Sequence, residues 1–388
     1  MPDRSLIFPA GEYRARIAAL QGAMADQQME ALLLTSAADI FYTTGFLTRF
    51  WESPARPWFV IVPATGAPVA VIPAIGQDLM RRTWIDDIRT WDAPDPEDDG
   101  VSLLSDTLAQ LTGPRARIGL PMGLETAVRM PLADLRRVEA GIATRAFVDA
   151  TAVVQRVREI KSEAEIEKIR DICAIAARAF EQVPQIVARA PQLDTVFRGF
   201  QAALLAEGAD WVSYTAGGAG PGGYGDVISP AAAVPLRSGD ILMLDTGAVK
   251  DGYFCDFDRN YAIGAPDSAA ERAHAALFAA TETALDRLRP GMTARDVHAM
   301  LTRALRAEGA EPGGGRLGHG LGITLTEWPS FTDKDDTPLR EGMVLTLEPG
   351  AVIAPGRMLV HEENIVLRAN GPELLSPRAP AKLPVIAI

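Results

Sequence analysis

Asp245, Asp256 and Asp258 lie in one short stretch of the chain, DILMLDTGAVKDGYFCDFDRNYAI, which covers residues 240–263. Two apolar segments flank the sequence VKDG, a pattern that predicts a β-hairpin. Asp256 and Asp258 are two residues apart, so their side chains share one face of a strand. Asp245 lies on the opposite strand of the same hairpin. The hairpin therefore gathers carboxylates that could bind a cation.

The register of this hairpin decides which aspartates face each other. A turn centred on residues 250–251 pairs Asp245 with Asp256, and a turn centred on 251–252 pairs it with Asp258. Either register crowds three carboxylates onto one face, because directly opposite residues share a face. Both registers remain open from the sequence.

Like charges directly opposite each other destabilise a sheet. They persist if a cation lies between them, if one carboxyl is protonated, or if the whole face is solvated. The neighbouring residues Met243, Phe254, Phe257 and Tyr261 are large and mostly apolar. A solvated edge hairpin is thus the weaker of the readings, and a cation site is the stronger.

A histidine and two glutamates later in the chain extend the set. His319 lies between glycines in GRLGHGLG, and if the ring binds a metal, these would let a compact backbone approach it and leave room for substrate. Glu348 and Glu362 each adjoin apolar, strand-like segments. With Asp245 and Asp256 they make four carboxylates, whose charge two divalent cations would neutralise. Oxygen-rich ligation with one nitrogen suits Mn, Fe, Co or Zn in five- or six-coordinate geometry.

The elements that must position these residues fall into two parts. In the first part, helical patterns at 10–28, 100–113 and 130–141 alternate with strand-like segments, which predicts an α/β domain over residues 1–152. In the second part, Ser162 and Glu165 form a capping box that begins a long amphipathic helix.

The second part continues with helical patterns at 193–208, 268–288 and 293–308, a glycine-rich loop at 216–225, and strand pairs up to the end. Because helices and strands are partly segregated here, we expect an α+β domain over residues 153–388. The junction between the two domains is expected near residues 151–161.

The composition excludes several classes of partner. The formal net charge is −12 over 388 residues, and the pI is about 5.0. This disfavours nucleic acid and anionic membranes, which both require basic surfaces. No apolar stretch is long enough to span a bilayer, the first residues do not resemble a secretory signal, and two cysteines are too few for a disulfide framework. We therefore expect a soluble cytoplasmic protein.

Together these motifs resemble the M24 metallopeptidases, in the Xaa-Pro dipeptidase, aminopeptidase P and creatinase branch. The Asp–x10–Asp spacing, the Gly-His-Gly box, TLEPG and VHEENIVL match the five ligand positions of that family. IFYTTGFLTRFW and REIKSEAEIEKIR resemble the N-terminal domain and linker of the same branch. The resemblance implies a C-terminal pita-bread domain after a creatinase-type N-terminal α/β domain. The implied metal ligands are Asp245, Asp256, His319, Glu348 and Glu362.

The implied activity is that of a dinuclear metal-dependent hydrolase, in which a hydroxide bridging the metals attacks an amide bond, with Mn²⁺ as the expected ion and Zn, Co or Fe as alternatives. We expect catalytic roles for Glu348, which can pass a proton to the leaving amine, for Asp258, which can orient a ligand, and for Thr326. The residues expected to bind substrate are Tyr214, Tyr224, Asp226, Arg49 and Trp51. The last two lie in a loop that, by the resemblance, reaches the partner's site in a homodimer.

The chain departs from the family pattern around the metal ligands. Thr326 stands where the peptidases have a histidine, Val227 or Ile228 stands at a second histidine position, and Val360 replaces a frequent arginine. These changes keep open an alternative, a non-peptidase that acts on a small molecule as a C–N hydrolase of the creatinase type or as a metal-dependent lyase. A non-catalytic scaffold protein on this fold would be expected to lose ligands, and none is missing.

Overall fold

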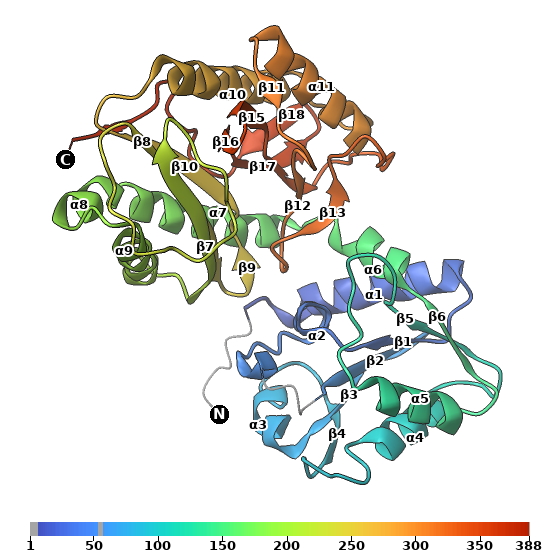
Figure 1. Cartoon of the computed structure of the whole chain (residues 1–388). Coiled ribbons are helices and arrows are strands. Elements are labelled where there is room, and N and C mark those ends of the chain that lie inside the picture. The colour runs from blue at the N-terminus through green and yellow to red at the C-terminus, as the bar shows by residue number, and fades with distance from the viewer. Residues whose placement is uncertain (1–6, 53–56, 388) are drawn as a thin grey trace. The chain divides into compact units, whose positions relative to one another are not determined.

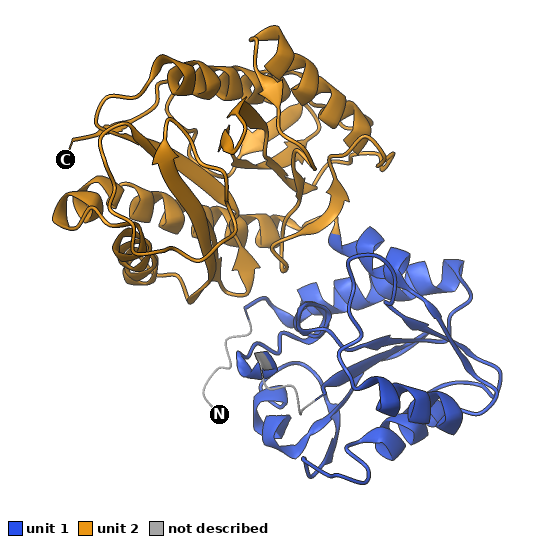
Figure 2. Cartoon of the chain, viewed as in Figure 1, with its two compact units in different colours: residues 1–158 blue, residues 159–388 orange. Residues whose placement is uncertain are grey.

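The computed structural model describes residues 7–52 and 57–387 of the chain (Figure 1). It divides into two compact units, Met1–Arg158 and Glu159–Ile388 (Figure 2). The division falls six residues after the expected boundary at 152, because residues 151–158 form a helix, α6, that packs on α1 of the first unit. Val153 and Val154 of that helix belong to the core of this unit.

Unit 1 is built on one mixed sheet of six strands in the order β4-β3-β2-β1-β5-β6. Its strands are β1 (Ala31–Leu34), β2 (Phe59–Pro63), β3 (Val69–Pro73), β4 (Asp87–Trp91), β5 (Arg117–Leu120) and β6 (Ala146–Asp149). Its helices are α1 (Ala10–Asp26), α2 (Ala37–Thr44), α3 (Gln77–Met80), α4 (Val101–Leu111), α5 (Leu132–Gly141) and α6 (Thr151–Arg158), with short 3-10 helices η1 (Phe50–Glu52) and η2 (Ala74–Gly76).

Helices cover both faces of this sheet. Along β1, Leu32 and Leu34 join one hydrophobic cluster with α1, α2 and α6, while Ala31 and Leu33 join a second cluster with α4 and α5. Alternate residues of a strand point to opposite faces, so a strand that is covered on both sides reads as a continuous apolar run. The predicted α/β class of this domain is confirmed.

Unit 2 carries the acidic hairpin. Its helices are α7 (Glu163–Phe180), α8 (Val183–Arg189), α9 (Leu193–Ala206), α10 (Ser268–Arg287) and α11 (Ala294–Ala307). Its strands are β7 (Trp211–Pro221), β8 (Asp240–Lys250), β9 (Tyr253–Phe254), β10 (Phe257–Ile263), β11 (Glu311–Pro312), β12 (His319–Gly320), β13 (Glu327–Ser330), β14 (Val344–Leu347), β15 (Gly350–Ala354), β16 (Arg357–Val360), β17 (Glu363–Arg368), β18 (Gly371–Leu374) and β19 (Val385–Ile386).

The strands of unit 2 lie between two groups of helices. One sheet has the order β19-β10-β8-β7, with β9 on β8; a second has the order β13-β12-β14-β17-β18; and β11-β15-β16 form a third. Helices α7 and α9 pack on β8 and β7, whereas α10 packs on β15, β16 and β18 (Figure 1). This segregated arrangement confirms the α+β class. Across the described residues, no helix is both long and apolar enough to cross a bilayer.

The glycine-rich segment expected as a loop at 216–225 is a strand over most of its length. Residues 216–221 belong to β7 and pair with β8. Gly217 has φ +141°, and a Cβ placed there would lie 2.1 Å from the carbonyl oxygen of Met243. The glycine permits a close approach of two strand backbones, a use that its loop-like composition concealed.

The capping box at the start of α7 is present as predicted. The Ser162 side chain accepts a hydrogen bond from the Glu165 backbone N–H, and the Glu165 carboxylate accepts one from the Ser162 N–H. Both bonds satisfy donors that the first turn of a helix leaves free.

We expect the substitution Ser162→Ala to lower the free energy of unfolding by about 1 kcal/mol, because it removes the cap acceptor. Urea denaturation followed by circular dichroism measures this change. Ser268→Ala is the matched control, because Ser268 is the exposed first residue of α10, whose cap is Asp267. Equal losses in the two variants would contradict the capping role.

Candidate metal centre

The β8–β10 hairpin adopts the second of the two possible registers. Asp245 pairs directly with Asp258. The turn lies at Asp251 and Gly252, with φ of +51° and +81°, the left-handed conformation that two-residue hairpin turns require. Asp256 precedes β10, and its side chain lines the same cavity as the other two aspartates.

All five expected ligand residues line this one cavity, which has a volume of about 270 Å³. Its remaining walls come from Tyr214, Val227, Ile228, Met243, Asp258, Arg316, Leu325 and Val360. The ligand residues reach the cavity from separate elements: β8, the residue before β10, β12, the residue after β14, and the residue before β17. The fold therefore converges side chains that are far apart in sequence.

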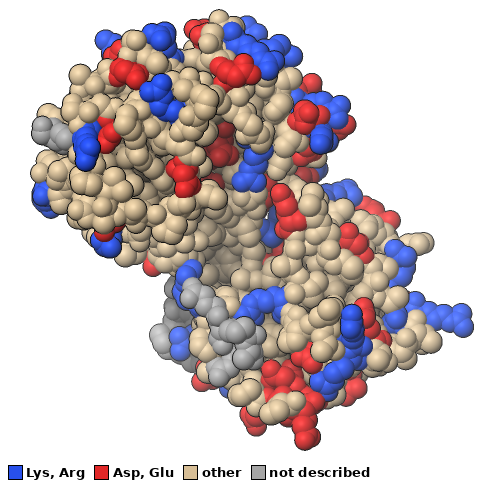
Figure 3. Space-filling model, in the orientation of Figure 1, with Lys and Arg blue, Asp and Glu red and all other residues tan. Residues whose placement is uncertain are grey.

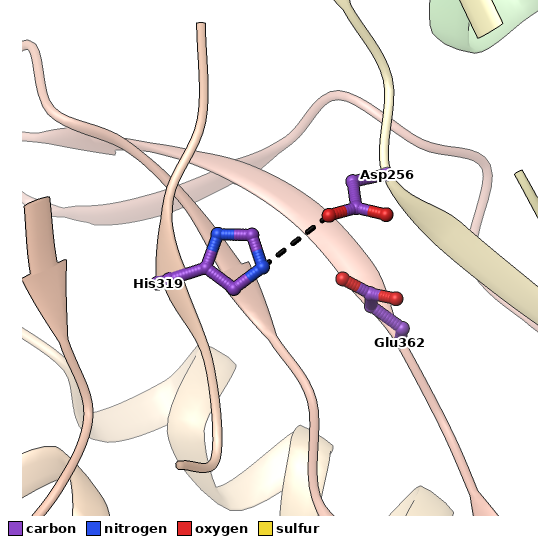
Figure 4. A group of neighbouring side chains, drawn as sticks. All are labelled: Asp256, His319 and Glu362. Carbon is purple, nitrogen blue, oxygen red and sulfur yellow. Dashed lines mark ion pairs between the residues drawn. The ribbon is translucent and has the colours of Figure 1, made fainter. Parts of the chain in front are cut away.

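Three of the five form the tightest group. One ligand atom each of Asp256, His319 and Glu362 lies within 4.8 Å of the other two, and both carboxylates point toward the imidazole ring (Figure 4). His319 Nε2 lies 3.3 Å from Asp256 Oδ2 and 3.9 Å from Glu348 Oε2. The spacing suits a cation held between them.

The hydrogen bonding and burial of His319 keep its imidazole in the neutral form that binds metals. His319 Nδ1 lies 2.8 Å from the carbonyl oxygen of Gly320, so Nδ1 carries the proton and Nε2 keeps its lone pair for the cavity. Burial lowers the pKa of His319, with a further contribution from the Arg316 charge. The ring is thus neutral near pH 7, the form that binds metals.

The carboxylates have oxygen atoms without hydrogen-bond partners. Asp245 Oδ1, Glu348 Oε2 and Glu362 Oε1 are buried and accept no hydrogen bond from the described residues. Burial, and for Asp245 the nearby charge of Asp256, raises the pKa of Asp245 and of Asp256 to about 7. Burial also raises the pKa of Glu348 to about 7 and that of Glu362 well above its usual range. Buried acceptors that repel one another and lack donors fit divalent cations.

The side chains of Asp258 and Asn364 form hydrogen bonds with the backbone of two ligand residues. Asp258 Oδ1 accepts a hydrogen bond of 2.6 Å from the Glu362 N–H, and its Oδ2 accepts one from Asn260. Asn364 accepts from the Asp256 N–H and donates to the Asp256 carbonyl oxygen. These contacts join the hairpin to β17, so Asp256 and Glu362 are positioned together.

Tyr214 lies against the ligands rather than on an open wall. Its hydroxyl donates to Asp245 and lies 3.2 Å from Asp256 Oδ1. An irregularity in the β7–β8 pairing between Val212 and Thr215 inserts an extra residue at this point, and such bulges re-aim side chains. No residue pattern in this segment predicted the bulge.

The other residues expected to bind substrate lie elsewhere. Tyr224 is buried behind the cavity, where it donates to Asn260 and accepts from the Val360 N–H. Asp226 is exposed and accepts from the backbone N–H groups of residues 228 and 229. In unit 1, Arg49 is exposed, and Trp51 is half-buried against Trp58 and the Arg129 guanidinium.

The segment around His319 contains Thr326, which was expected to be catalytic, and Arg316, which the sequence analysis did not single out. The Thr326 hydroxyl accepts a hydrogen bond of 3.2 Å from Arg316. Arg316, three residues before His319, lines the cavity. Its place as a single basic residue in a glycine-rich segment could have marked it in the sequence as a candidate site residue. Gly320 lies between two neighbouring strands, and a Cβ there would lie 2.0 Å from the Trp328 carbonyl oxygen. This glycine thus serves strand packing rather than space for a substrate.

Comparison with known proteins agrees with this geometry. The model of the M24 metallopeptidase family matches residues 167–369, and that of the creatinase/prolidase N-terminal domain matches residues 16–160. A probable dipeptidase PepE of Mycobacterium tuberculosis is 30% identical over 385 residues, which cover 98% of each chain. A Xaa-Pro dipeptidase of Pyrococcus horikoshii is 27% identical over 258 residues, covering 66% of this chain and 72% of that protein.

Solved structures give the same result. The crystal structure of dipeptidase PepE from Mycobacterium ulcerans superposes with a TM-score of 0.84 at 27% identity, covering 98% of this chain and 100% of the other. A prolidase of Thermococcus sibiricus, 21% identical, has the same fold with a TM-score of 0.85 over 97% of this chain and 99% of its own. The chain therefore belongs to the M24 metallopeptidase family, and is a hydrolase with a creatinase/prolidase-type N-terminal domain and a pita-bread C-terminal domain.

Proposed function

We propose that the protein is a dipeptidase that uses two divalent cations, preferably Mn²⁺, to hydrolyse dipeptides with proline in the second position. The observation that carries the proposal is the set of three buried carboxylate oxygens, without hydrogen-bond partners among the described residues, on side chains that line the same cavity as His319. Four carboxylates confined to one cavity repel one another, by about 4 kcal/mol for each pair of unit charges 4 Å apart at an effective dielectric constant of 20. Two divalent cations would balance this charge.

The donor set suggests how the cations would be shared. Asp245, Asp256 and Glu362 would hold or bridge them, and His319 and Glu348 would complete the shell of one. Cations bound here supply Lewis acidity and lower the pKa of water to near neutrality.

The residues of the chain would do the remaining work. The Glu348 side chain is 32% accessible, more than those of His319 and Asp256, so its carboxyl group can take up a proton and pass it to the leaving amine. Asp258 holds the backbone of Glu362 through its hydrogen bond. Thr326 supports the Arg316 side chain at the cavity wall.

Apolar side chains line part of the cavity wall. Val227 and Ile228 stand at one of the family's histidine positions, Val360 stands at its frequent arginine position, and Leu325 lies beside them; Ile228 is 87% exposed. These four side chains would contact the ring of a proline residue and keep water from it. The relatives named above are peptidases, and therefore the small-molecule hydrolase or lyase alternative is not favoured.

We further propose that the protein acts as a cytoplasmic homodimer in which the loop with Arg49 and Trp51 contributes to substrate binding in the partner. Arg49 and Phe50 are exposed on this loop. Trp51 packs on the core of unit 1 and would hold the loop in place.

Removal of metal ions is expected to abolish hydrolysis of alanyl-proline, and added Mn²⁺ is expected to restore it, because the cations supply the Lewis acid. Activity would be measured by release of free proline before chelation, after dialysis against a chelator, and after addition of Mn²⁺, Zn²⁺ or Co²⁺. Full activity of metal-free protein would contradict the proposal.

The substitution Glu362→Gln is expected to weaken Mn²⁺ binding by about 100-fold or more, because a neutral amide replaces a charged ligand. Isothermal titration calorimetry measures the affinity and the number of ions bound. Glu341→Gln is the control, since Glu341 is exposed in the turn before β14. Unchanged affinity in the Glu362 variant would remove Glu362 from the ligand set.

The substitution Arg49→Ala is expected to lower kcat/KM by about tenfold, the size of one lost charge-assisted contact. Light scattering after gel filtration tests the dimer, and Arg115→Ala, a change at another exposed position of unit 1, is the control. A monomeric protein, or kinetics unaffected by the Arg49 change, would contradict the role of the loop.

A further inference from the structure

Arg316 is the one guanidinium that lines the metal cavity among the described residues. It is half-buried, and its Nη2 donates to the Thr326 hydroxyl at 3.2 Å. On the face of unit 2 drawn in Figure 3, acidic atoms lie deep in a hollow and basic atoms lie at its edge. The cavity thus combines a cation site with one permanent positive charge.

This guanidinium differs from the other arginines close to the ligand strands. Arg259 is engaged by the Glu363 carboxylate at 3.1 Å and by the Glu362 carbonyl oxygen at 3.1 Å. Arg378 pairs with Glu363 at 3.0 Å and with Glu282 at 2.8 Å. Over residues 7–52 and 57–387, by contrast, no carboxylate lies within the 4.0 Å of an ion pair from Arg316. Its charge is therefore available to a ligand.

The surroundings of the guanidinium favour an anion. Two divalent cations would cancel the four ligand carboxylates, and the two oxygens of Asp258 accept hydrogen bonds from N–H groups of other residues, not from Arg316. The Arg316 guanidinium thus has no carboxylate among the described residues at ion-pair distance and lies in a partly enclosed space, where a charge-assisted hydrogen bond is stronger than in water. The planar guanidinium fork matches a carboxylate through two parallel bonds.

We propose that Arg316, oriented by Thr326, binds a carboxylate of the peptide substrate. The inference rests on the proposed peptidase function and deepens it, because it specifies which peptides the site selects. A dipeptide offers two sources of this group, its C-terminal carboxylate and the side chain of an acidic residue. If the C-terminal group is bound, a longer peptide would place an uncharged amide beside Arg316, so the site would favour dipeptides.

The test compares matched substrates in the metal-loaded enzyme. Alanyl-proline and its C-terminal amide differ only in the terminal carboxylate, and aspartyl-proline amide and asparaginyl-proline amide differ only in a side-chain carboxylate. The variants are Arg316→Gln, the conservative Arg316→Lys, and the control Arg306→Gln on the exposed face of α11, where Arg306 pairs with Glu311. Mn²⁺ content is measured for each variant.

The wild-type enzyme is expected to prefer one acid over its amide by about 10- to 100-fold in kcat/KM, the strength of a charge-assisted contact. Arg316→Gln should remove that preference by lowering kcat/KM for the acid alone, Arg316→Lys should retain part of it, and Arg306→Gln should retain all of it. The pair that loses its preference identifies the source of the carboxylate.

Several results would overturn the inference while leaving the peptidase function intact. These are a wild-type enzyme that hydrolyses each acid and its amide equally well, and an Arg316→Gln variant that keeps its Mn²⁺ and either retains the preference or loses activity equally on acids and amides. If the wild-type enzyme hydrolyses none of the four peptides, the proposed function fails first, and the inference fails with it.

Discussion

Mutual repulsion among carboxylates in one cavity is the constraint on which the rest of the structure depends. Asp245, Asp256, Glu348 and Glu362 meet in about 270 Å³, and burial raises the pKa of each. A fold that places these groups together must hold them by other contacts until a cation arrives. The strands of unit 2 meet this need, because the carboxylates lie on or beside four different strands, β8, β10, β14 and β17.

The holding contacts act on the backbone as much as on the side chains. Asn364 binds both the N–H and the carbonyl oxygen of Asp256, and Asp258 binds the N–H of Glu362. Tyr214 contacts the side chain of Asp245, and burial raises the pKa of its phenol, which therefore stays protonated and donates. These neighbours fix orientation without occupying all the oxygens that a cation would use.

Much of the fold could be predicted from local sequence patterns. The predictions failed where contacts between distant segments determine the local structure. The capping box at Ser162 and the acidic hairpin follow from residue type and spacing, and the Asp251–Gly252 sequence was a signal for the register that the structure adopts. The strand at 216–221 was missed because its glycines, typical of loops, are needed for the approach of β8. No periodicity of a single strand reveals a close approach to its neighbour.

The site was predictable in its residues and less so in their surroundings. Resemblance to a family named the five ligand positions, and the structure brings all five to one cavity. The contact of Tyr214 with Asp245 depends on a bulge that propensity does not encode, and Arg316 reaches the cavity only because the glycine-rich segment before His319 folds beside it. Tyr224 and Asp226, which were expected to bind substrate, are not among the residues that line the cavity, and both form hydrogen bonds with protein groups.

The two hydrogen bonds between Asn364 and the backbone N–H and carbonyl groups of Asp256 affect how the centre exchanges its ions. Because Asn364 bonds to the main chain of Asp256 and leaves its carboxylate free, loss of a cation need not disrupt the hairpin. Folding alone brings the ligand side chains together, so the ion binds to a preorganised site. Loading and unloading of the centre can then proceed with little rearrangement of the polypeptide.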